Sequence, residues 1–294
     1  MFIDAHLHTV AVPGLPRSTA GEGFATPEEL IAMMDRTGVD KGVLLPCVSP
    51  ECAFQLSTTE DVLGVCARYP ERFIPFCNLD PRALGNAPGS DLSFALRYYR
   101  ERGCRGLGEI TANLPFTDPL VRNLFTHCAA CHLPVLFHIA PAQGGYYGLV
   151  DILGLPGLAQ SLRDFPELVF IGHSQPFWAE ISGDLTEAAR NSYPPGPIAA
   201  GGALIRWLDE FPNLCCGWDA GSGYNALTRD AEFGYRFMET YRDRILFGTD
   251  ICSPLNTHQH AQYLRAARAE GKISEAAFEA ISWRNANRLF QLGL

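Results

Sequence analysis

The sequence predicts an α/β protein folded as one (β/α)8 barrel, the TIM-barrel fold, over residues 1–294. Three observations favour this fold. Eight short apolar segments alternate with segments of helical length along the chain. These apolar segments are nearly continuous in hydrophobic residues, which is typical of parallel strands covered on both faces. A length of 294 residues suits one barrel of this type, and neither a linker nor an internal repeat divides the chain.

The predicted elements follow one another in strict alternation. The first helix begins at Thr26-Pro27-Glu28-Glu29, where a capping residue precedes proline and two acidic residues. The predicted strands are 2–8, 41–46, 72–79, 104–111, 133–139, 168–173, 214–219 and 245–250. The predicted helices are 26–38, 58–69, 91–102, 118–131, 155–164, 202–211 and 230–241, with a largely helical tail over 258–292. A doubly wound open sheet is the alternative, but no glycine-rich phosphate motif follows the first strand.

Net charge and cysteine content argue against a nucleic-acid-binding protein and against a protein stabilised by disulfides. A formal net charge of −9 argues against a nucleic-acid-binding surface. Ten irregularly spaced cysteines in a chain of this length are not a disulfide framework. No secretory signal precedes the first strand and no apolar run is long enough to span a membrane. We therefore expect a reduced, cytoplasmic protein that acts on a small molecule, and a homodimer is left open.

Chemistry-bearing side chains gather at the C-terminal ends of the predicted strands. Side chains alternate along a strand, so Asp4, His6 and His8 share one face of the first strand. Further polar residues follow apolar runs on four other strands: Glu109, His138, His173 and Asp250. Burying such groups is costly without a partner, and the same end of one barrel would bring them together. A shared divalent cation is the simplest partner.

At this point the sequence resembles the amidohydrolase superfamily from end to end. His6-Leu7-His8, His138, His173 and Asp250 match its metal-binding pattern. Three segments resemble the amidohydrolase-related branch that includes aminocarboxymuconate-semialdehyde decarboxylase: 68–73 (RYPERF), 247–250 (FGTD) and 285–290 (NANRLF). The metal-binding residues and these three segments together are specific for the family, whereas each of them alone is not.

The resemblance implies a role for each site residue. His6, His8 and Asp250 would hold a first cation, and His138 and His173 a second. A metal-activated water would be the nucleophile and Asp250 its general base. With a single metal, His173 would contact the substrate instead. The expected cofactor is a divalent transition metal, with zinc favoured, at one or two ions per chain.

Glu109 departs from the decarboxylases. Many superfamily members have a carboxylated lysine on the fourth strand, where this chain has Glu109, similar to the metal-dependent deoxyribonuclease branch. A glutamate can bridge two cations as a carbamate does. The alternative is a structural ion pair with Arg105 or Arg102, which would leave one metal and favour a decarboxylase.

The substrate contacts are less sharply indicated. Arg17 lies in the first loop, and Trp178 and Arg190 lie in or next to the long irregular stretch 179–201. The segment 219–225, which contains Tyr224 and Asn225, follows the seventh strand and could offer backbone amides to an anion or serve as a tight connector. One histidine of His258-Gln259-His260, or Cys252, could face the pocket. The haem-like pattern of Cys128, Cys131 and His132 is interpreted as buried thiols at a helix end.

Taken together, the sequence favours a metal-dependent hydrolase of a small molecule. The first alternative is a metal-dependent, non-oxidative decarboxylase of an unsaturated or aromatic acid. The second is a barrel that binds metal or ligand without turnover, against which the presence of Asp250 argues.

Overall fold

Eight parallel strands close into a barrel in the computed structural model, which describes residues 1–17, 19 and 22–294. The barrel strands are β1 (Ile3–Leu7), β2 (Lys41–Leu44), β3 (Phe73–Pro75), β4 (Leu107–Ile110), β5 (Val135–Ala140), β7 (Phe170–His173), β8 (Leu214–Trp218) and β9 (Ile245–Phe247). They form two sheets, in the orders β1-β2-β3 and β4-β5-β7-β8-β9. Parallel bridges between Cys77 and Leu107 and between Leu7 and Ile251 join the two sheets at both edges. The predicted (β/α)8 barrel is confirmed.

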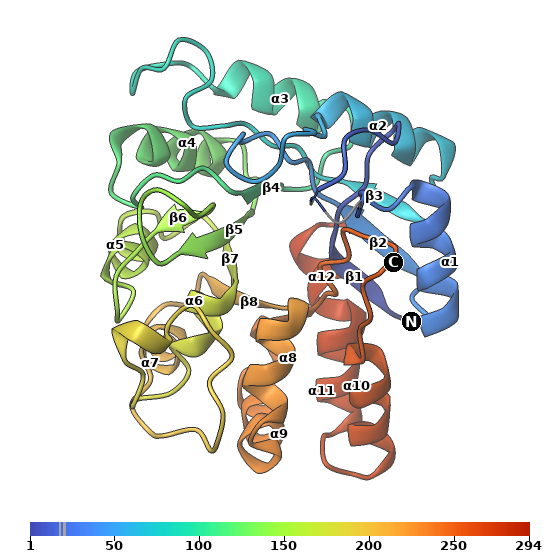
Figure 1. The fold of residues 1–294 in the computed structure, drawn as a ribbon, viewed down its shortest axis with the longest axis vertical. Coiled ribbons are helices and arrows are strands. Elements are labelled where there is room, and N and C mark those ends of the chain that lie inside the picture. Colours follow the sequence, from blue (N-terminus) through green and yellow to red (C-terminus); the bar gives the residue numbers. More distant parts are fainter. Residues whose placement is uncertain (18, 20–21) are drawn as a thin grey trace.

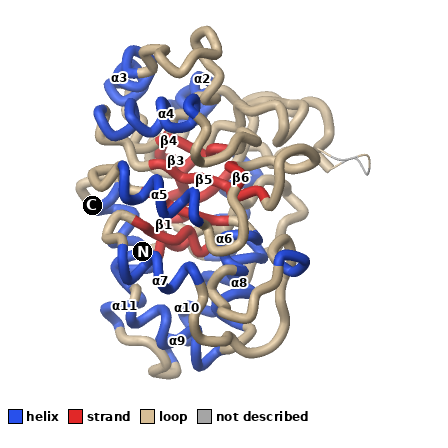
Figure 2. Tube along the Cα trace, turned by 90° about the vertical axis from the view of Figure 1, so that its left-hand side faces the viewer, coloured by secondary structure: helices blue, strands red, loops and turns tan. Residues whose placement is uncertain are grey.

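Helices surround the strands on the outside (Figures 1 and 2). The main helices are α1 (Pro27–Thr37), α2 (Thr59–Arg68), α3 (Ser93–Glu101), α4 (Pro119–Ala130), α5 (Pro156–Asp164), α7 (Ala203–Glu210), α9 (Ala231–Thr240) and α10 (His260–Ala269). The predicted start of α1 is a complete capping box, in which Glu29 N donates to Thr26 Oγ1 at 3.2 Å and Thr26 N donates to Glu29 Oε2 at 2.8 Å.

Several short elements were not expected from the sequence. They are the two-residue strand β6 (Leu149–Val150), α6 (Gln175–Ala179), α8 (Ala220–Thr228) and the 3-10 turns Glu187–Ala189 and Arg242–Arg244. The helical tail also contains α11 (Glu275–Glu279), a π-helical turn (Ala280–Arg284) and α12 (Asn285–Leu289). Helix α8 matters most for the site, because it begins directly after β8, where the sequence suggested an anion-binding turn or a tight connector.

The barrel interior is apolar at one end and polar at the other. Its apolar cluster contains Ile3, Val43, Leu136, Ile171 and Leu246, and the C-terminal segment packs beneath it. There the Phe290 ring meets the Phe76 ring edge-on at 4.9 Å. Further along the same strands come the polar side chains of the predicted site. The fold therefore presents these groups at the C-terminal end of the barrel, where TIM-barrel enzymes have their active sites.

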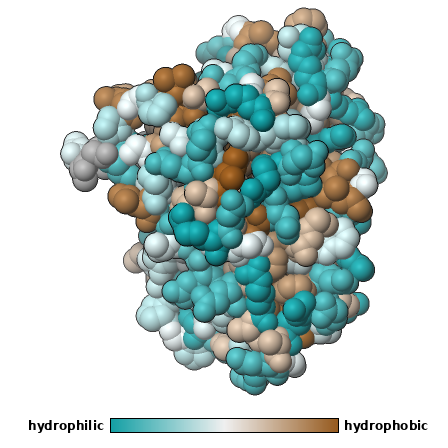
Figure 3. Space-filling view, turned by 90° about the vertical axis from the view of Figure 1, so that its right-hand side faces the viewer, coloured by the Kyte–Doolittle hydropathy of each residue, from teal (hydrophilic) through white to brown (hydrophobic). Residues whose placement is uncertain are grey.

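The outer surface is mostly hydrophilic on the flank shown in Figure 3, with hydrophobic side chains in small separate groups. Within the described part of the chain, no helix combines the length and apolar character needed to cross a membrane.

Candidate metal centre

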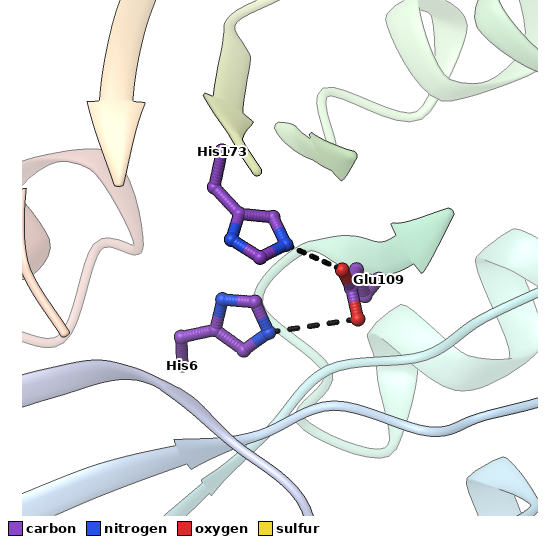
Figure 4. A group of neighbouring side chains, drawn as sticks. All are labelled: His6, Glu109 and His173. Carbon is purple, nitrogen blue, oxygen red and sulfur yellow. Dashed lines mark hydrogen bonds and ion pairs between the residues drawn. The ribbon is translucent and has the colours of Figure 1, made fainter. Parts of the chain in front are cut away.

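The structure brings all six predicted ligand side chains together at the C-terminal end of the barrel. Glu109 contacts all four histidines of the group, and Figure 4 shows its contacts with His6 and His173. Its Oε1 lies 2.6 Å from His173 Nε2 and 3.0 Å from His138 Nδ1. Its Oε2 lies 3.3 Å from His8 Nε2 and 3.6 Å from His6 Nε2. The two oxygens of one carboxylate thus face two separate pairs of histidines.

Asp250 completes the half of the group that contains His6 and His8. Its Oδ1 lies 3.4 Å from His6 Nε2 and 3.5 Å from His8 Nε2. The Asp250 side chain is 25% exposed, whereas the Glu109 side chain is 4% exposed. Asp250 is therefore the more exposed of the two acids. Donor atoms of two overlapping trios lie close enough to share an ion: His6 with Glu109 and His173, and His6 with His8 and Asp250.

Unusual backbone conformations place these side chains. Gly108 has a φ of 148°, and a Cβ there would lie 2.5 Å from the Leu136 carbonyl oxygen, so only glycine fits before Glu109. Asp250 has a left-handed φ of 57°, and its backbone N–H donates to the His6 carbonyl at 2.9 Å. Ser174, directly after His173, has a φ of 107°. Such conformations in non-glycine residues tend to occur at functional sites.

Asp219 has a role at the site that the sequence did not predict. It follows β8, is fully buried, and bridges two ligands: Oδ2 accepts from His6 Nδ1 at 2.9 Å and Oδ1 from His173 Nδ1 at 2.8 Å. Its position at the C-terminal end of the seventh barrel strand is the signal that could have identified it. In the sequence, however, it also has the form of a helix-capping residue.

Hydrogen bonds at the Nδ1 atoms of His6, His8 and His173 determine which ring nitrogen carries the proton. His8 Nδ1 lies 3.0 Å from the Leu45 carbonyl, which can only accept, so Nδ1 carries the proton. The Asp219 carboxylate does the same for His6 and His173. The Nε2 atoms of all three rings therefore turn their lone pairs inward. The Nε2 atoms of His6 and His8 are only 2.9 Å apart, and this short distance requires a proton or a metal cation between them.

The buried carboxylates of the site favour positive charge on the histidines next to them. Burial alone would lower the pKa of His8, but hydrogen bonds to Asp250 and Glu109 raise it to about 9. Burial opposes the charged form of His173 as well, yet Asp219 and Glu109 raise its pKa to about 10. Burial would raise the pKa of Glu109, but His173, His138 and His6 hold it well below the usual range. Imidazole nitrogens and ionised carboxylates around one point are the ligands that zinc and similar divalent metals prefer, so the donor set fits the expected cofactor.

A cavity of about 190 Å³ opens onto the centre and provides space for a substrate. Its inner wall contains His8, Glu109 and Asp250. The rest of the wall is formed by Ala220 and Gly221 at the start of α8 and by loop residues, namely Arg17, Phe24, Cys47, Cys52, Tyr147, Cys252, Asn256 and His258. Arg17 lies over the Phe24 ring at 5.0 Å and donates from Nη1 to Cys252 Sγ at 2.7 Å. Within the described residues, Arg17 forms no ion pair with a carboxylate.

A model of the amidohydrolase family matches residues 3–292. The chain belongs to the amidohydrolase family. The resemblance to the amidohydrolases that the sequence predicted is therefore confirmed. No curated protein sequence matches this amidohydrolase significantly.

Solved structures share the fold of this amidohydrolase at low sequence identity. An uncharacterised TIM-barrel protein of Bordetella bronchiseptica has a TM-score of 0.68 and 18% identity, covering 99% of this chain and 98% of its own. The 5-carboxyvanillate decarboxylase of Sphingomonas paucimobilis has a TM-score of 0.62 and 16% identity, over 99% and 98% of the two chains. A probable 2-pyrone-4,6-dicarboxylic acid hydrolase of Acinetobacter baumannii has a TM-score of 0.57 and 16% identity, over 99% of each chain.

Two residues predicted to contact the substrate lie in the interior of the protein instead. Trp178 in α6 is 1% exposed and donates from Nε1 to the Gly217 carbonyl at 3.0 Å. Arg190 is fully buried, with Nε 3.4 Å from Glu180 Oε1 and Nη1 donating to the Asp151 carbonyl at 3.1 Å. The long loop folds inward, so neither side chain lines the cavity.

The segment after β8 also differs from the expectation. Tyr224 and Asn225 lie in α8, and neither lines the cavity: the Tyr224 hydroxyl donates to Gln259 Oε1 at 3.1 Å, and Asn225 borders a narrow crevice beside Trp178. The residues of this segment that do reach the cavity are Ala220 and Gly221.

The structure also shows where the other residues considered in the sequence lie. The structural ion pair suggested for Glu109 is absent from the described part of the chain, because its contacts there are histidines. His258 and Cys252 line the cavity, whereas His260 is buried between Trp218 and Tyr224. Cys128 and Cys131 are buried free thiols, as interpreted from the sequence.

Proposed function

We propose that this amidohydrolase is a metal-dependent hydrolase of a small-molecule substrate with a binuclear centre. His6, His8 and Asp250 would hold one cation, His138 and His173 the other, and Glu109 would bridge them. The observation that carries the proposal is the position of Glu109, whose Oε1 faces His138 and His173 while its Oε2 faces His6 and His8. A carboxylate in that position can serve two ions at once.

The burial and contacts of the side chains indicate a separate chemical role for each of them. When bound, divalent cations supply Lewis acidity, which lowers the pKa of water and polarises a scissile carbonyl or phosphoryl oxygen. Asp250, the more exposed acid, would accept the proton of the attacking water and transfer it to the leaving group. Asp219 would hold the rings of His6 and His173 in one tautomer. His8 would be held by the Leu45 carbonyl in the same way.

A small carboxylic acid is the substrate class that fits the cavity best. Its volume of about 190 Å³ is below the usual range of ligand pockets, which favours a small molecule. Arg17 offers a guanidinium with five donors, suited to a carboxylate. The similar solved structures named above for acid substrates agree with this class.

Non-oxidative decarboxylation is the second candidate. Two similar solved structures carry decarboxylase names, the 5-carboxyvanillate enzyme and a 2,6-dihydroxybenzoate decarboxylase from Rhizobium. A centre with one metal would leave His173 available to contact the substrate. The same residues would then serve a carboxy-lyase.

Metal counting combined with a substrate panel tests the proposal. Protein purified without chelators is loaded with zinc, desalted and assayed for metal, with lactones, amides, phosphoesters and unsaturated acids as substrates. We expect about two ions per chain, falling to one or fewer in Glu109→Gln, and hydrolysis without CO2 release. One ion per chain together with CO2 release would overturn the hydrolase in favour of the decarboxylase.

A further inference from the structure

A second cavity lies directly beside the substrate cavity. Its volume is about 220 Å³, and its lining includes Arg36, Asn256 and His258. Asn256 and His258 line both cavities. These two residues of the loop between β9 and α10 are therefore the wall that separates the two spaces.

The two residues of this wall are held very differently. Asn256 is fixed, because its Oδ1 accepts from the backbone N–H groups of Cys252 and Ser253, each at 2.9 Å. His258 has a buried Nε2 with no hydrogen-bond partner in the described structure, and its ring lies 5.8 Å from the His260 ring. A buried ring nitrogen without a partner is costly, and a ligand can satisfy it.

Each cavity is lined by one arginine. Arg17 lies in the substrate cavity, and Arg36, in the last turn of α1, lines the second cavity. Neither arginine forms an ion pair with any carboxylate in the described part of the chain. An anionic group is therefore favoured in either space, and the imidazole of His258 stands between them.

We propose that His258 determines substrate specificity: its ring limits the length of the substrate, and its free Nε2 binds a polar group at the non-reacting end. The proposal rests on the proposed function, in that the reacting end of the substrate lies at the metal centre. Burial lowers the pKa of His258, which keeps the ring neutral and able to donate from one nitrogen and accept at the other. The ligand class is a short dicarboxylate or a similar acid with a polar group at its far end.

Binding of linear dicarboxylates to the zinc-loaded protein tests both parts of the proposal. The probes are succinate, glutarate, adipate and pimelate, measured by calorimetry. The wild type should bind the short members best. His258→Ala opens the wall, so pimelate should gain affinity about tenfold, and adding Arg36→Ala should remove that gain. His258→Phe keeps the volume of the side chain but lacks the nitrogen. It should keep the order of affinities with chain length and lower the affinity for the short dicarboxylates about fivefold. His258→Gln should recover most of that affinity.

The exposed His132→Asn is the matched control and should behave as the wild type. The same length order in His258→Ala as in the wild type, or no binding of any probe to the wild type, would overturn the proposal. The readout is binding, not turnover. A length effect in this binding assay, together with no hydrolysis in the substrate panel described above, would therefore support the role of His258 and reject the hydrolase. Hydrolysis in the panel without a length effect in binding would support the hydrolase and reject the role of His258.

Discussion

Asp219 Oδ2 accepts a hydrogen bond from His6 Nδ1 at 2.9 Å, and this contact joins the end of β8 to the first strand of the barrel. The other oxygen of the same carboxylate accepts from His173 Nδ1 at 2.8 Å. One buried acid therefore orients a ligand from each half of the centre. His173 pairs with His138 around Glu109 Oε1, while His6 faces Glu109 Oε2 with His8.

Asp219→Asn should weaken metal binding while leaving the fold intact. An amide can accept at only one of its two positions, so its NH2 group would face the Nδ1–H of His6 or His173 and force the other tautomer. We expect metal affinity to fall about 10–100-fold, measured by competition with a chromophoric chelator. Asp243→Asn, at an exposed position, is the control and should bind as the wild type does. Equal affinities in the two variants would show that Asp219 does not position the ligands.

Asp250→Asn tests the general base. The amide keeps the shape of the side chain but cannot accept a proton, so kcat should fall by about 10²–10⁴-fold. The measurement is steady-state turnover on the best substrate of the panel, alongside metal content and the circular dichroism spectrum. Turnover close to that of the wild type at full metal occupancy would remove Asp250 from the proton transfer.

Arg17→Gln tests the anchor at the mouth of the cavity. Arg17 lines the same cavity as His8, Glu109 and Asp250 and would bind the carboxylate of the substrate in both ground and transition states. Its loss should therefore raise KM about tenfold or more with little change in kcat. Arg17→Lys keeps the charge but not the fork and should recover part of the loss. An unchanged KM for acid substrates would place the carboxylate elsewhere.

Arg82→Gln should lower stability in a pH-dependent way. Arg82 bonds Asp80 at 2.6 Å and Glu51 at 2.9 Å, which braces the loops after β2 and β3. Burial alone would raise the pKa of both carboxyls, but Arg82 holds both below their usual range. Acids with a lowered pKa in the folded state stabilise it above their unfolded pKa, near 4, and lose this effect as pH falls through the folded pKa.

The expected loss in Arg82→Gln is therefore about 1–2 kcal/mol at pH 7, since Arg82 is one-third exposed and partly screened, and it should be smaller at pH 3. Urea unfolding at both pH values measures it, with the exposed Arg97→Gln as control. A loss that is equal at both pH values would show that the ion pairs are not its source.

The sequence was sufficient for the barrel and for the convergence of the ligands, because both follow from periodicity. Polar side chains after apolar strands must meet at one end once the barrel closes, and His6, His8 and Glu109 do so. Asp219 could not be separated from an ordinary helix cap, since its contacts lie 213 and 46 residues away in sequence.

The loops were the least predictable part. Trp178 and Arg190 looked accessible in or next to an irregular stretch, but that stretch folds inward and buries both. There Arg190 forms ion pairs with Glu180 and Glu187 and donates to the Asp151 carbonyl. No local pattern reveals such a cluster, because loop conformation depends on tertiary contacts. The same reason explains why the wall formed by Asn256 and His258 was visible only in three dimensions.

Anomalous diffraction from crystals grown with zinc is the most direct test of the metal centre. Data collected above and below the zinc absorption edge locate the metal independently of activity. We predict peaks on both sides of the Glu109 carboxylate, about 2.0–2.2 Å from the ligand nitrogens and oxygens of the two halves. A map without any peak among these side chains, at zinc concentrations that saturate the protein in solution, would contradict the account.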